Sequence, residues 1–581
     1  MSHSTPYQVR TAVPGPRAAG QGTSADAFRK AAGLVDAKTI GLDDALRRVT
    51  GAQLGELLLP RFGPPEPGRG RRPLLTRGVP AAPGAATGTA VFDPVAAVDQ
   101  AAAGERVVLI RARTTAADLP GILVADAVVI TGADRLAGSA AALARGLGTP
   151  CVAGAADLRI DPAARRALLP DGRVLVEGDQ VSVDGGTGEL RLGAEPLAPS
   201  PVAHYLATGE THPADVPLVS AVSQLLTHAD RVRRLGVRAD ADTAAEARQA
   251  RLLGADGVGL CRTERAFRGP ARTLVEEAVL AGSDEARRRA LAELLPVQRA
   301  QLAGVLGEMD RRPVAVRLFD APLGRFLPDR TALAVHLATL AAAGSPQDPH
   351  EVAQLAAADR VHEHNPMLGL RGARLALTWP ELLEVQVRAL AGAVAECRAA
   401  GGEPRPELLV PLVASSVETE LIRDRVRRIL DATAGESGGT VDLRIGAVLE
   451  LPRATVTADR IAGTADFFAF GTDDLTQTVW GLSREDAEAG ILPEYLERGI
   501  LAASPFESLD GAGVGHLISR ALRAARRVDP GLRAGVYGSH GSDAASIRFF
   551  HTTGVDHVSC RPQRVPVARL EAGRAALGHL D

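Results

Sequence analysis

The stretch from residue 445 to residue 474 reads IGAVLELPRATVTADRIAGTADFFAFGTDD and contains two short apolar segments with a helix-like stretch between them. The first segment, Ile445–Glu450, ends in a glutamate, and the second, Phe467–Asp474, ends in an aspartate. Short apolar runs bounded by turn signals are typical of buried strands. The stretch therefore predicts two strands, each with a carboxylate at its end.

The same pattern recurs in the C-terminal part of the chain. The six other segments are Leu235–Arg238, Gly257–Arg262, Val314–Arg317, Leu408–Val413, Ala534–Tyr537 and Val555–Arg561, and most are separated by helix-like stretches. Eight βα units at this spacing predict a TIM barrel, whose active site lies at the C-terminal ends of its strands. We therefore expect the polar residues that close these segments to carry the chemistry.

Composition indicates an ordinary soluble protein. The 581 residues carry a net charge of −3 with both signs well mixed, so neither nucleic acid nor an acidic membrane surface is favoured as a partner. No apolar run is long enough to span a membrane, and the N-terminus lacks an apolar signal core, so we expect a cytoplasmic protein. A zinc site or a disulfide framework is not expected, because four cysteines stand apart without CxxC spacing: Cys151, Cys261, Cys397 and Cys560.

Proline and glycine divide the chain into four parts. Residues 1–77 hold one clear helix, about Leu42 to Leu59, and a linker. Residues 78–192 alternate short β runs with an Ala-rich helical stretch, Ser139 to Leu147, and predict a compact β/α domain. Residues 193–234 form a second linker, and residues 235–581 form the barrel. The predicted fold class is therefore α/β.

Two carboxylates are the first candidate site. Glu450 and Asp474 each end a strand, and carboxylates that converge at a barrel mouth suit Mg²⁺, which keeps waters and substrate oxygens as its other ligands. The alternative is two solvated acids at strand ends. Asp473 would add a second negative charge near the metal, or it would cap a loop.

Three arginines close other segments at the same rim. Arg262 stands in GLCRTE, Arg317 in VRLFD and Arg371 in NPMLGLRG. Guanidinium forks match phosphate and carboxylate groups, so three of them predict a small polyanionic substrate. The alternative for each is an ordinary surface arginine.

The stretch GVYGSHGSD places Tyr537 and His540 at the end of the seventh segment. A tyrosine there could donate a proton to a developing carbanion. Its ordinary pKa is about 10, which a nearby cation could lower. The alternative, an aromatic residue that only packs, is the more frequent one at a strand end. His540 is a second candidate for the proton carrier.

The chain resembles the family of phosphoenolpyruvate-utilising enzymes that includes pyruvate, phosphate dikinase. The resemblance covers about Leu42 to the C-terminus, and its barrel motifs are highly specific in combination. The matching stretches are PGAATGTAVFD, ARGLGTPCVAGA, EGDQVSVDGGTGEL, ADADTAAEARQARLLGADGVGLCRTE, RLFDAPLGRFLP, NPMLGLRGARL, ELPRA, FGTDDLTQ and VSCRPQRVPVARL.

The resemblance implies a swivelling phosphohistidine domain at residues 78–192 and a barrel that binds phosphoenolpyruvate or pyruvate at residues 235–581. It implies Mg²⁺, or Mn²⁺, on Glu450 and Asp474, and a homodimer formed through the barrel. The substrate-binding residues that it implies are Arg262, Arg317, Asp320, Arg371, Glu450, Gly471, Thr472, Asp473 and Asp474.

Departures from the family pattern bear on activity. Ser139 stands where the family has its phosphoryl-accepting histidine, and no histidine occurs between His3 and His204. A serine phosphate ester is too stable to return its phosphoryl group to pyruvate. The roughly 60 residues before the first linker are too few for an ATP-grasp domain, which folds as a domain of ordinary size. ATP-driven dikinase activity by this chain alone is therefore not expected.

Two further departures lie in the barrel. Tyr537 stands in the place of the family's proton-donating cysteine, and Asp473 in the place of an asparagine. An extra carboxylate should repel a fully charged phosphate by on the order of 1 to 4 kcal/mol at about 4 Å. That favours pyruvate or another 2-oxo acid over phosphoenolpyruvate.

The sequence thus predicts a Mg²⁺-dependent protein that binds phosphoenolpyruvate, pyruvate or a related 2-oxo acid. Two alternatives stay open. One is a lyase or aldolase type of enzyme that forms the enolate of a 2-oxo acid on Mg²⁺. The other is a catalytically inactive protein that senses the ligand.

Overall fold

The computed structural model describes residues 23–63, 70–114, 118–132, 141, 144, 148–162, 164–267, 269–435 and 439–578. The chain divides into two compact units, which are described separately. The first comprises Met1–His228 and Leu482–Glu507, and the second comprises Ala229–Gly481 and Ser508–His579.

The second unit is built on a closed barrel of eight parallel strands in chain order. The strands are β14 (Gly236–Asp240), β15 (Val258–Arg262), β16 (Pro313–Arg317), β17 (Arg405–Val410), β18 (Arg444–Val448), β19 (Phe467–Gly471), β20 (Ala534–Tyr537) and β21 (His557–Cys560). Most of their residues are buried, as parallel strands covered on both faces must be. All eight predicted strands are confirmed.

Helices follow the strands and cover the barrel. They include α9 (Ala244–Leu252), α12 (Leu294–Glu308), α16 (Pro380–Ala399), α17 (Ser416–Thr433), α23 (Val514–Val528), α24 (Ala544–Thr553) and α25 (Val565–Ala576). Thr243 and Glu246 form a reciprocal capping box at the start of α9, and Ser415 and Glu418 form another at the start of α17. These caps fix where two of the loops at the strand ends stop and the helices begin.

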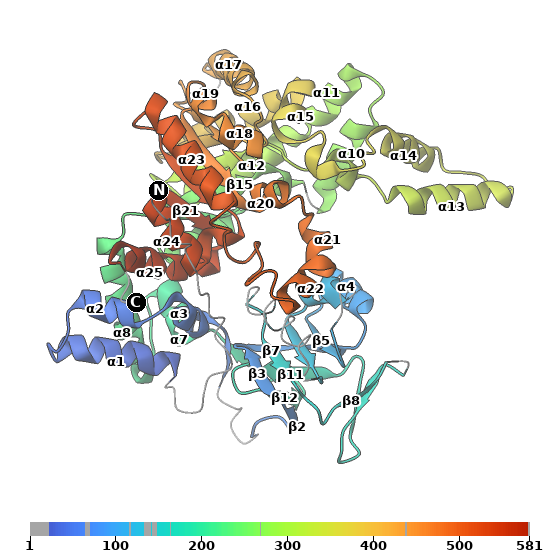
Figure 1. Ribbon diagram of the computed structural model, residues 1–581. Helices are drawn as coiled ribbons and strands as arrows, with labels where there is room; N and C mark the ends of the chain where they lie inside the picture. Colours follow the sequence, from blue (N-terminus) through green and yellow to red (C-terminus); the bar gives the residue numbers. More distant parts are fainter. Residues whose placement is uncertain are drawn as a thin grey trace, which may run out of the picture. The chain divides into compact units, whose positions relative to one another are not determined.

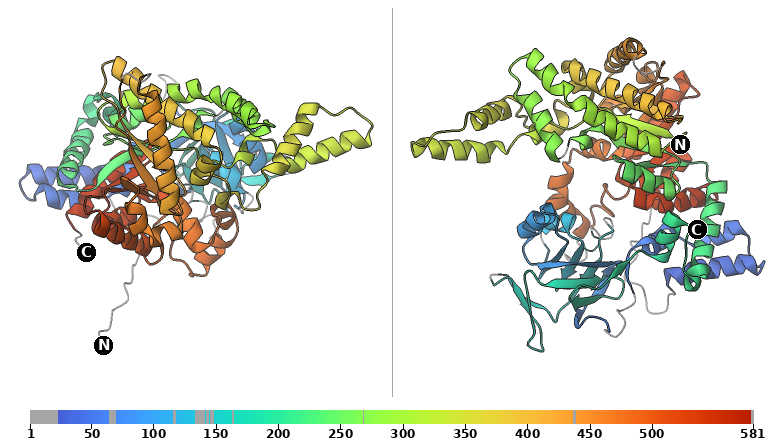
Figure 2. Two further views of the ribbon diagram at one scale, coloured as in Figure 1. Left: turned by 90° about the horizontal axis from the view of Figure 1, so that it is seen from above. Right: turned by 180° about the vertical axis from the view of Figure 1, so that it is seen from behind.

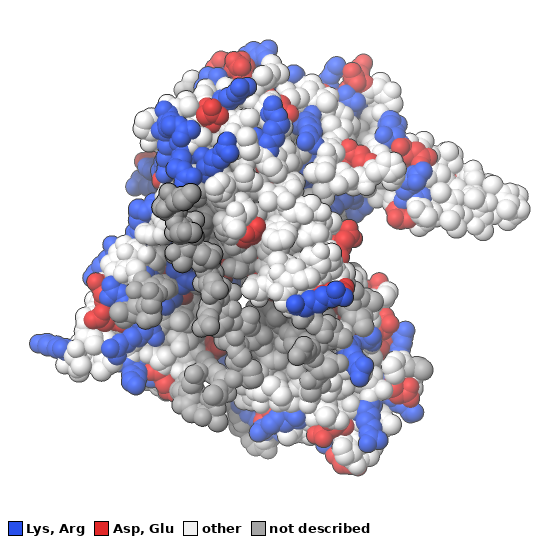
Figure 3. Space-filling view, viewed as in Figure 1, with Lys and Arg blue, Asp and Glu red and all other residues white. Residues whose placement is uncertain are grey.

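Two long insertions enlarge the barrel unit. The first, after β15, contains α10 (Arg272–Leu280) and α11 (Asp284–Ala292), and the second, after β16, contains α13 (Arg330–Ala342), α14 (Pro349–Arg360) and α15 (Gly372–Thr378). The hairpin α13–α14 extends away from the barrel (Figures 1 and 2). Its outer part, residues 331–347, contains no Lys, Arg, Asp or Glu and is white in Figure 3.

The first unit contains a mixed eight-stranded sheet in the order β2-β12-β11-β4-β5-β6-β7-β3. Its strands are β2 (Leu74–Arg77), β3 (Val79–Ala82), β4 (Ala85–Val91), β5 (Val107–Arg111), β6 (Ala127–Ile130), β7 (Cys151–Ala153), β11 (Gln180–Asp184) and β12 (Glu189–Leu192). Successive residues of β5 enter different core clusters, Val108 and Ile110 in one and Val107 and Leu109 in the other. The sheet therefore has an apolar core on each face, in the region predicted as a β/α domain.

The N-terminal region differs from the prediction of a single helix over about Leu42 to Leu59. It forms α2 (Leu42–Arg48) and α3 (Gly51–Leu58), because Val49 is extended and Thr50 caps α3 in a reciprocal pair with Gln53. A further helix, α1 (Ser24–Asp36), was not predicted, although Thr23 and Asp26 form the same kind of cap.

Other boundaries also differ in detail. The segment predicted as a linker, 193–234, contains α7 (Pro201–Thr208) and α8 (Val216–Val232). Residues 482–507, with α21 (Arg484–Ala489) and α22 (Ile491–Glu497), cluster with the first unit although they lie inside the predicted barrel range. Ser139 lies outside the described residues. Within the described ranges, every helix is too short or too polar to cross a membrane.

Candidate active site

Three carboxylates converge at the C-terminal ends of the barrel strands. Asp320 follows β16, Glu450 follows β18, and Asp474 lies in the first turn of α20 (Thr472–Trp480), directly after β19. One carboxylate oxygen from each lies within 4.8 Å of the others. The structure therefore places Asp320, which the resemblance implied for substrate binding, beside the two predicted metal ligands.

Burial disfavours the ionised form of the carboxylates in this cluster. Burial raises the pKa of Asp320 to about 6, although Arg317 and Arg371 oppose the shift. Burial and the neighbouring Asp474 and Asp320 carboxylates raise the pKa of Glu450 to about 8. Oxygen donors crowded together in a buried site are the ligand set that a hard divalent cation prefers.

Both oxygens of Glu450 are held by protein donors. The Leu412 N–H donates to Oε1 at 2.6 Å, and the Tyr537 hydroxyl donates to Oε2 at 3.1 Å. Leu412 has a φ of 56°, in the left-handed region that non-glycine residues rarely adopt. A carboxylate oxygen has two lone pairs, so each Glu450 oxygen keeps one for a cation.

Gly471 makes room for this arrangement. A Cβ at this position would collide with the Glu450 carboxylate and lie 3.0 Å from the Tyr537 hydroxyl. Gly471 ends β19, and its φ of −83° is open to any residue. The glycine is therefore required for space and not for backbone conformation.

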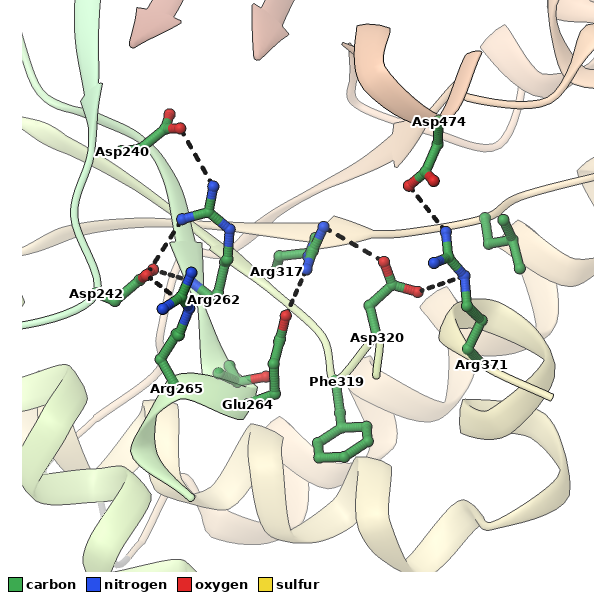
Figure 4. Close-up of polar contacts among 12 residues, drawn as sticks. Asp240, Asp242, Arg262, Glu264, Arg265, Arg317, Phe319, Asp320, Arg371 and Asp474 are labelled. Carbon is green, nitrogen blue, oxygen red and sulfur yellow. Dashed lines mark hydrogen bonds and ion pairs between the residues drawn. The ribbon is translucent and has the colours of Figure 1, made fainter. Parts of the chain in front are cut away.

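Arg317 and Arg371 bridge the carboxylates (Figure 4). Arg371 contacts Asp474 at 2.8 Å and Asp320 at 3.5 Å, while Arg317 contacts Glu264 at 2.5 Å and Asp320 at 3.3 Å. Burial alone would lower the pKa of Arg317, but Glu264 and Asp320 raise it well above its ordinary value. Arg317 Nε is buried and has no hydrogen-bond partner among the described residues.

The charges of this inner group fit a divalent cation. It comprises two arginines, Arg317 and Arg371, and four carboxylates, Glu264, Asp320, Glu450 and Asp474. If all were ionised, two positive and four negative charges would leave −2. The residues that are present therefore match Mg²⁺ or Mn²⁺ in donor chemistry and in charge.

Arg262 occupies a neighbouring part of the rim. The Arg262 guanidinium contacts Asp240 at 3.3 Å and Asp242 at 3.1 Å, and the Arg262 backbone N–H donates to Asp242 Oδ1 at 2.7 Å. Arg265 also contacts Asp242 (Figure 4). The three predicted arginines thus lie along one edge of the barrel, each paired with carboxylates.

Asp473 and His540 hold the loop after β20. The Ser539 N–H lies 3.2 Å from both Asp473 oxygens, and the Ser539 hydroxyl also donates to Asp473. The Thr472 hydroxyl donates to the Tyr537 carbonyl at 3.1 Å, so His540 Nδ1, 2.8 Å from that hydroxyl, must donate its proton. Asp473 therefore makes the loop contact that was one of its two expected roles.

Tyr537 lies in the barrel interior. It belongs to a core cluster with Leu260, Val448 and Phe467. Burial and the Glu450 carboxylate raise the pKa of its hydroxyl well above the ordinary value, in the direction opposite to the lowering considered from the sequence. The phenol is thus a protonated donor to Glu450, and its role as a proton carrier stays a prediction.

Several residues of the site were missed. The segment expected to end at Arg238 continues to Asp240, so Arg238 is buried in the interior, 2.5 Å from Glu407. Asp240 and Asp242 in RADADT and Glu264 in CRTE are the partners of the rim arginines. Acidic residues just after a strand were the available signal. No feature of the sequence indicated the hydrogen bond from the Leu412 N–H to Glu450.

Comparisons with known proteins agree with this geometry. Residues 218–577 match the family described as PEP-utilising enzyme, PEP-binding domain, and residues 103–188 match its mobile domain. Pyruvate, phosphate dikinase of Rhizobium meliloti (strain 1021) is 39% identical over 96% of this chain and 59% of its own length. Pyruvate, phosphate dikinase of Clostridium symbiosum is 37% identical over 96% of this chain and 61% of its own length.

The chain spans about three-fifths of the length of these curated relatives, 59% and 61%. Among solved structures, an HpcH/HpaI aldolase from Desulfitobacterium hafniense DCB-2 aligns at 12% identity with a TM-score of 0.25. That alignment covers 56% of this chain and 85% of the aldolase chain.

Proposed function

Because the chain belongs to the family of phosphoenolpyruvate-utilising enzymes, we propose that its barrel binds a small 2-oxo acid such as pyruvate, or phosphoenolpyruvate, together with Mg²⁺. The observation that carries the proposal is the cluster of Asp320, Glu450 and Asp474, in which one carboxylate oxygen from each residue lies within 4.8 Å of the others. Oxygen ligands of this kind suit Mg²⁺, with Mn²⁺ as the alternative.

The arginines supply the ligand's other contacts. Arg317 and Arg371 border the carboxylate cluster, and a guanidinium fork binds a carboxylate or phosphate group through two parallel hydrogen bonds. Arg317 Nε is buried and has no hydrogen-bond partner among the described residues, so it is a donor that these protein groups leave unsatisfied. Arg262 extends the basic edge along the rim.

We propose enolate chemistry without phosphoryl transfer as the reaction class. A bound Mg²⁺ would stabilise negative charge on the carbonyl oxygen of a 2-oxo acid as an enolate forms. Tyr537 would carry the proton, with its hydroxyl at the Glu450 carboxylate. Ser139, in the place of the family's phosphoryl-accepting histidine, argues against a phosphoryl relay through residues 78–192.

A ligand sensor without turnover is the second candidate. The burial of Tyr537 in the barrel core and the raised pKa of its hydroxyl favour the sensor, because a phenol that only donates to Glu450 would have a structural role. The homodimer and the cytoplasmic location stay predictions from the resemblance and the composition. Sedimentation of the purified chain would test the homodimer.

Exchange of the methyl hydrogens of pyruvate with deuterium oxide separates enzyme from sensor. We expect exchange faster than in buffer with Mg²⁺ alone, and a loss of roughly 100-fold or more in Tyr537→Phe, as for loss of a general acid or base. Tyr495→Phe, on α22, is the matched control. Affinity for oxalate, a mimic of the pyruvate enolate, is measured alongside.

Each outcome points to one conclusion. Lost exchange with unchanged oxalate affinity supports a proton carrier. Exchange that survives in Tyr537→Phe transfers that role to His540 or to water. If no 2-oxo acid that binds shows Mg²⁺-dependent exchange, the sensor is the correct candidate.

A further inference from the structure

A cavity of about 300 Å³ lies in the barrel unit, and none of its lining residues belongs to the carboxylate cluster. It is bordered by the end of α10, by α11, by the segment that follows α14, and by Trp379. This volume is at the lower end of the range that ligand pockets span, so it suits a small molecule. We propose that the cavity binds a free α-amino acid with an apolar side chain, such as leucine.

One wall of the cavity is apolar and held in place. Val279 and Leu323 are buried, and Trp379 lies under the Arg287 guanidinium, 4.8 Å from the ring centroid. Arg287 is in turn anchored by Glu381 and by Asp284, the latter at 2.8 Å. Its charge is therefore matched by protein carboxylates, and the wall offers an apolar surface for an aliphatic or aromatic side chain.

Two charged residues at the same cavity, Arg360 and Glu363, have no ion-pair partner among the residues that the structure describes. Across the described ranges of the chain, no carboxylate forms an ion pair with Arg360, whose guanidinium donates to the Val279 carbonyl at the end of α10. Glu363 likewise forms no ion pair with a described residue, and its carboxylate accepts the Leu370 N–H at 2.7 Å. One cation and one anion beside an apolar wall match the carboxylate, the ammonium and the side chain of an amino acid.

Helix ends add to the preference for an ammonium group. Val279 lies in the last turn of α10, and Arg360 is the last residue of α14. The carbonyl ends of helices carry partial negative charge. A ligand that carries only a negative charge would be repelled by Glu363 and by these helix ends. An uncharged apolar molecule would leave the charges of Arg360 and Glu363 without a partner. A zwitterion avoids both costs.

The cavity is joined to the rim through the chain itself. Leu370 lines the cavity, and the next residue, Arg371, pairs with Asp474 and Asp320. An amino acid that weakens the hydrogen bond from the Leu370 N–H to the Glu363 carboxylate would therefore change the position of Arg371 at the rim. This regulatory effect rests on the proposed function of the rim, whereas binding at the cavity does not.

Calorimetric titration of the unaltered full chain with L-leucine tests the proposal. We expect saturable binding of one molecule per chain. Three analogues that each lack one group, 4-methylpentanoate, 3-methylbutylamine and glycine, should bind about tenfold more weakly or worse, because a charged hydrogen bond or apolar contact is lost. This series needs no variant to fold. No saturable binding of L-leucine up to about 10 mM, or equal affinity for 4-methylpentanoate, overturns the proposal.

Variants then locate the site. Arg360→Gln and Glu363→Gln should each weaken L-leucine about tenfold or more. The matched control is Arg428→Gln, because Arg428 is an exposed arginine on α17 that also contacts a backbone carbonyl. Binding unchanged in both cavity variants overturns the assignment. Mg²⁺-dependent oxalate binding is measured in parallel, so that failure at the cavity and failure at the rim are told apart.

Discussion

Glu450 is oriented before any ligand arrives, because the Leu412 N–H binds one of its oxygens and the Tyr537 hydroxyl binds the other. Leu412 adopts a left-handed backbone conformation to present this N–H. Conformations of this kind cost of order 1–3 kcal/mol and tend to occur at functional sites. At the residue scale, the site is therefore built to hold one carboxylate in place.

The charge of Asp473 gives the first prediction at this scale. Asp473→Asn should tighten binding of phosphoenolpyruvate more than binding of pyruvate, because only phosphoenolpyruvate carries a phosphate that the carboxylate repels. The loop contact with Ser539 can be kept by the amide oxygen. Titration of both ligands in the presence of Mg²⁺ measures the ratio of affinities. A ratio unchanged from the unaltered protein removes the electrostatic argument.

At the scale of elements, the site depends on how strands pass into helices. Asp473 and Asp474 lie in the first turn of α20, where the positive end of the helix dipole favours acidic residues. Gly471 joins β19 to α20 and leaves room for Glu450 and Tyr537. The junction thus places one candidate metal ligand and makes space for another.

Gly471→Ala tests that junction. The new methyl group should displace the Glu450 carboxylate and cut Mg²⁺-dependent oxalate affinity by about tenfold or more, as expected when one charged ligand contact is lost. The fold should survive, because the φ of Gly471 is allowed for alanine. Gly463→Ala is the control, since its Cβ would meet only a carbonyl at 3.6 Å. Equal oxalate affinity in both variants would show that this space is not needed.

Elements were predictable where one local pattern decided them. Most barrel strands are short apolar runs closed by a polar residue, so the segments were visible without the structure. The break between α2 and α3 was missed because it depends on one cap, between Thr50 and Gln53, within an otherwise helical stretch. The arginine pairs were missed because they depend on contacts between neighbouring strand ends, as between Arg262 and Asp240.

At the scale of the whole molecule, the buried carboxylates link stability to pH and metal. In the folded chain the pKa of Glu450 is raised from 4.5 to about 8 and that of Asp320 from 3.8 to about 6. Between the ordinary and the raised pKa of each residue, the folded state binds more protons than the unfolded state. The free energy of unfolding therefore falls as pH rises through this window.

Thermal unfolding from about pH 5 to pH 8 checks this linkage. Without metal, the chain should lose stability with rising pH more steeply than the Glu450→Gln variant, which lacks the Glu450 proton and keeps only that of Asp320. Saturating Mg²⁺ should flatten the profile of the unaltered chain, because the cation replaces the protons. Parallel profiles for the two proteins in the absence of metal would contradict the assignment of a buried, proton-binding Glu450.

The resemblance identified the barrel and most of the candidate residues at its rim, but reasoning from the residues alone did not include Asp320 among the candidate metal ligands. Glu450 and Asp474 end predicted strands, whereas Asp320 stands three residues beyond Arg317 in a loop. Its place beside the other two depends on the closure of the barrel, which brings loops distant in the sequence to one rim. No pattern of spacing contains that information.

The central claim is that the carboxylates at the barrel rim form a metal site for a 2-oxo acid. Titration with oxalate, with and without Mg²⁺, tests it most directly. We predict binding that requires Mg²⁺ or Mn²⁺ and is abolished in Glu450→Ala and Asp474→Ala, whereas Arg262→Ala and Arg371→Ala weaken oxalate without abolishing metal binding. Equal oxalate affinity in EDTA would contradict the account, because the carboxylates would then not be a metal site.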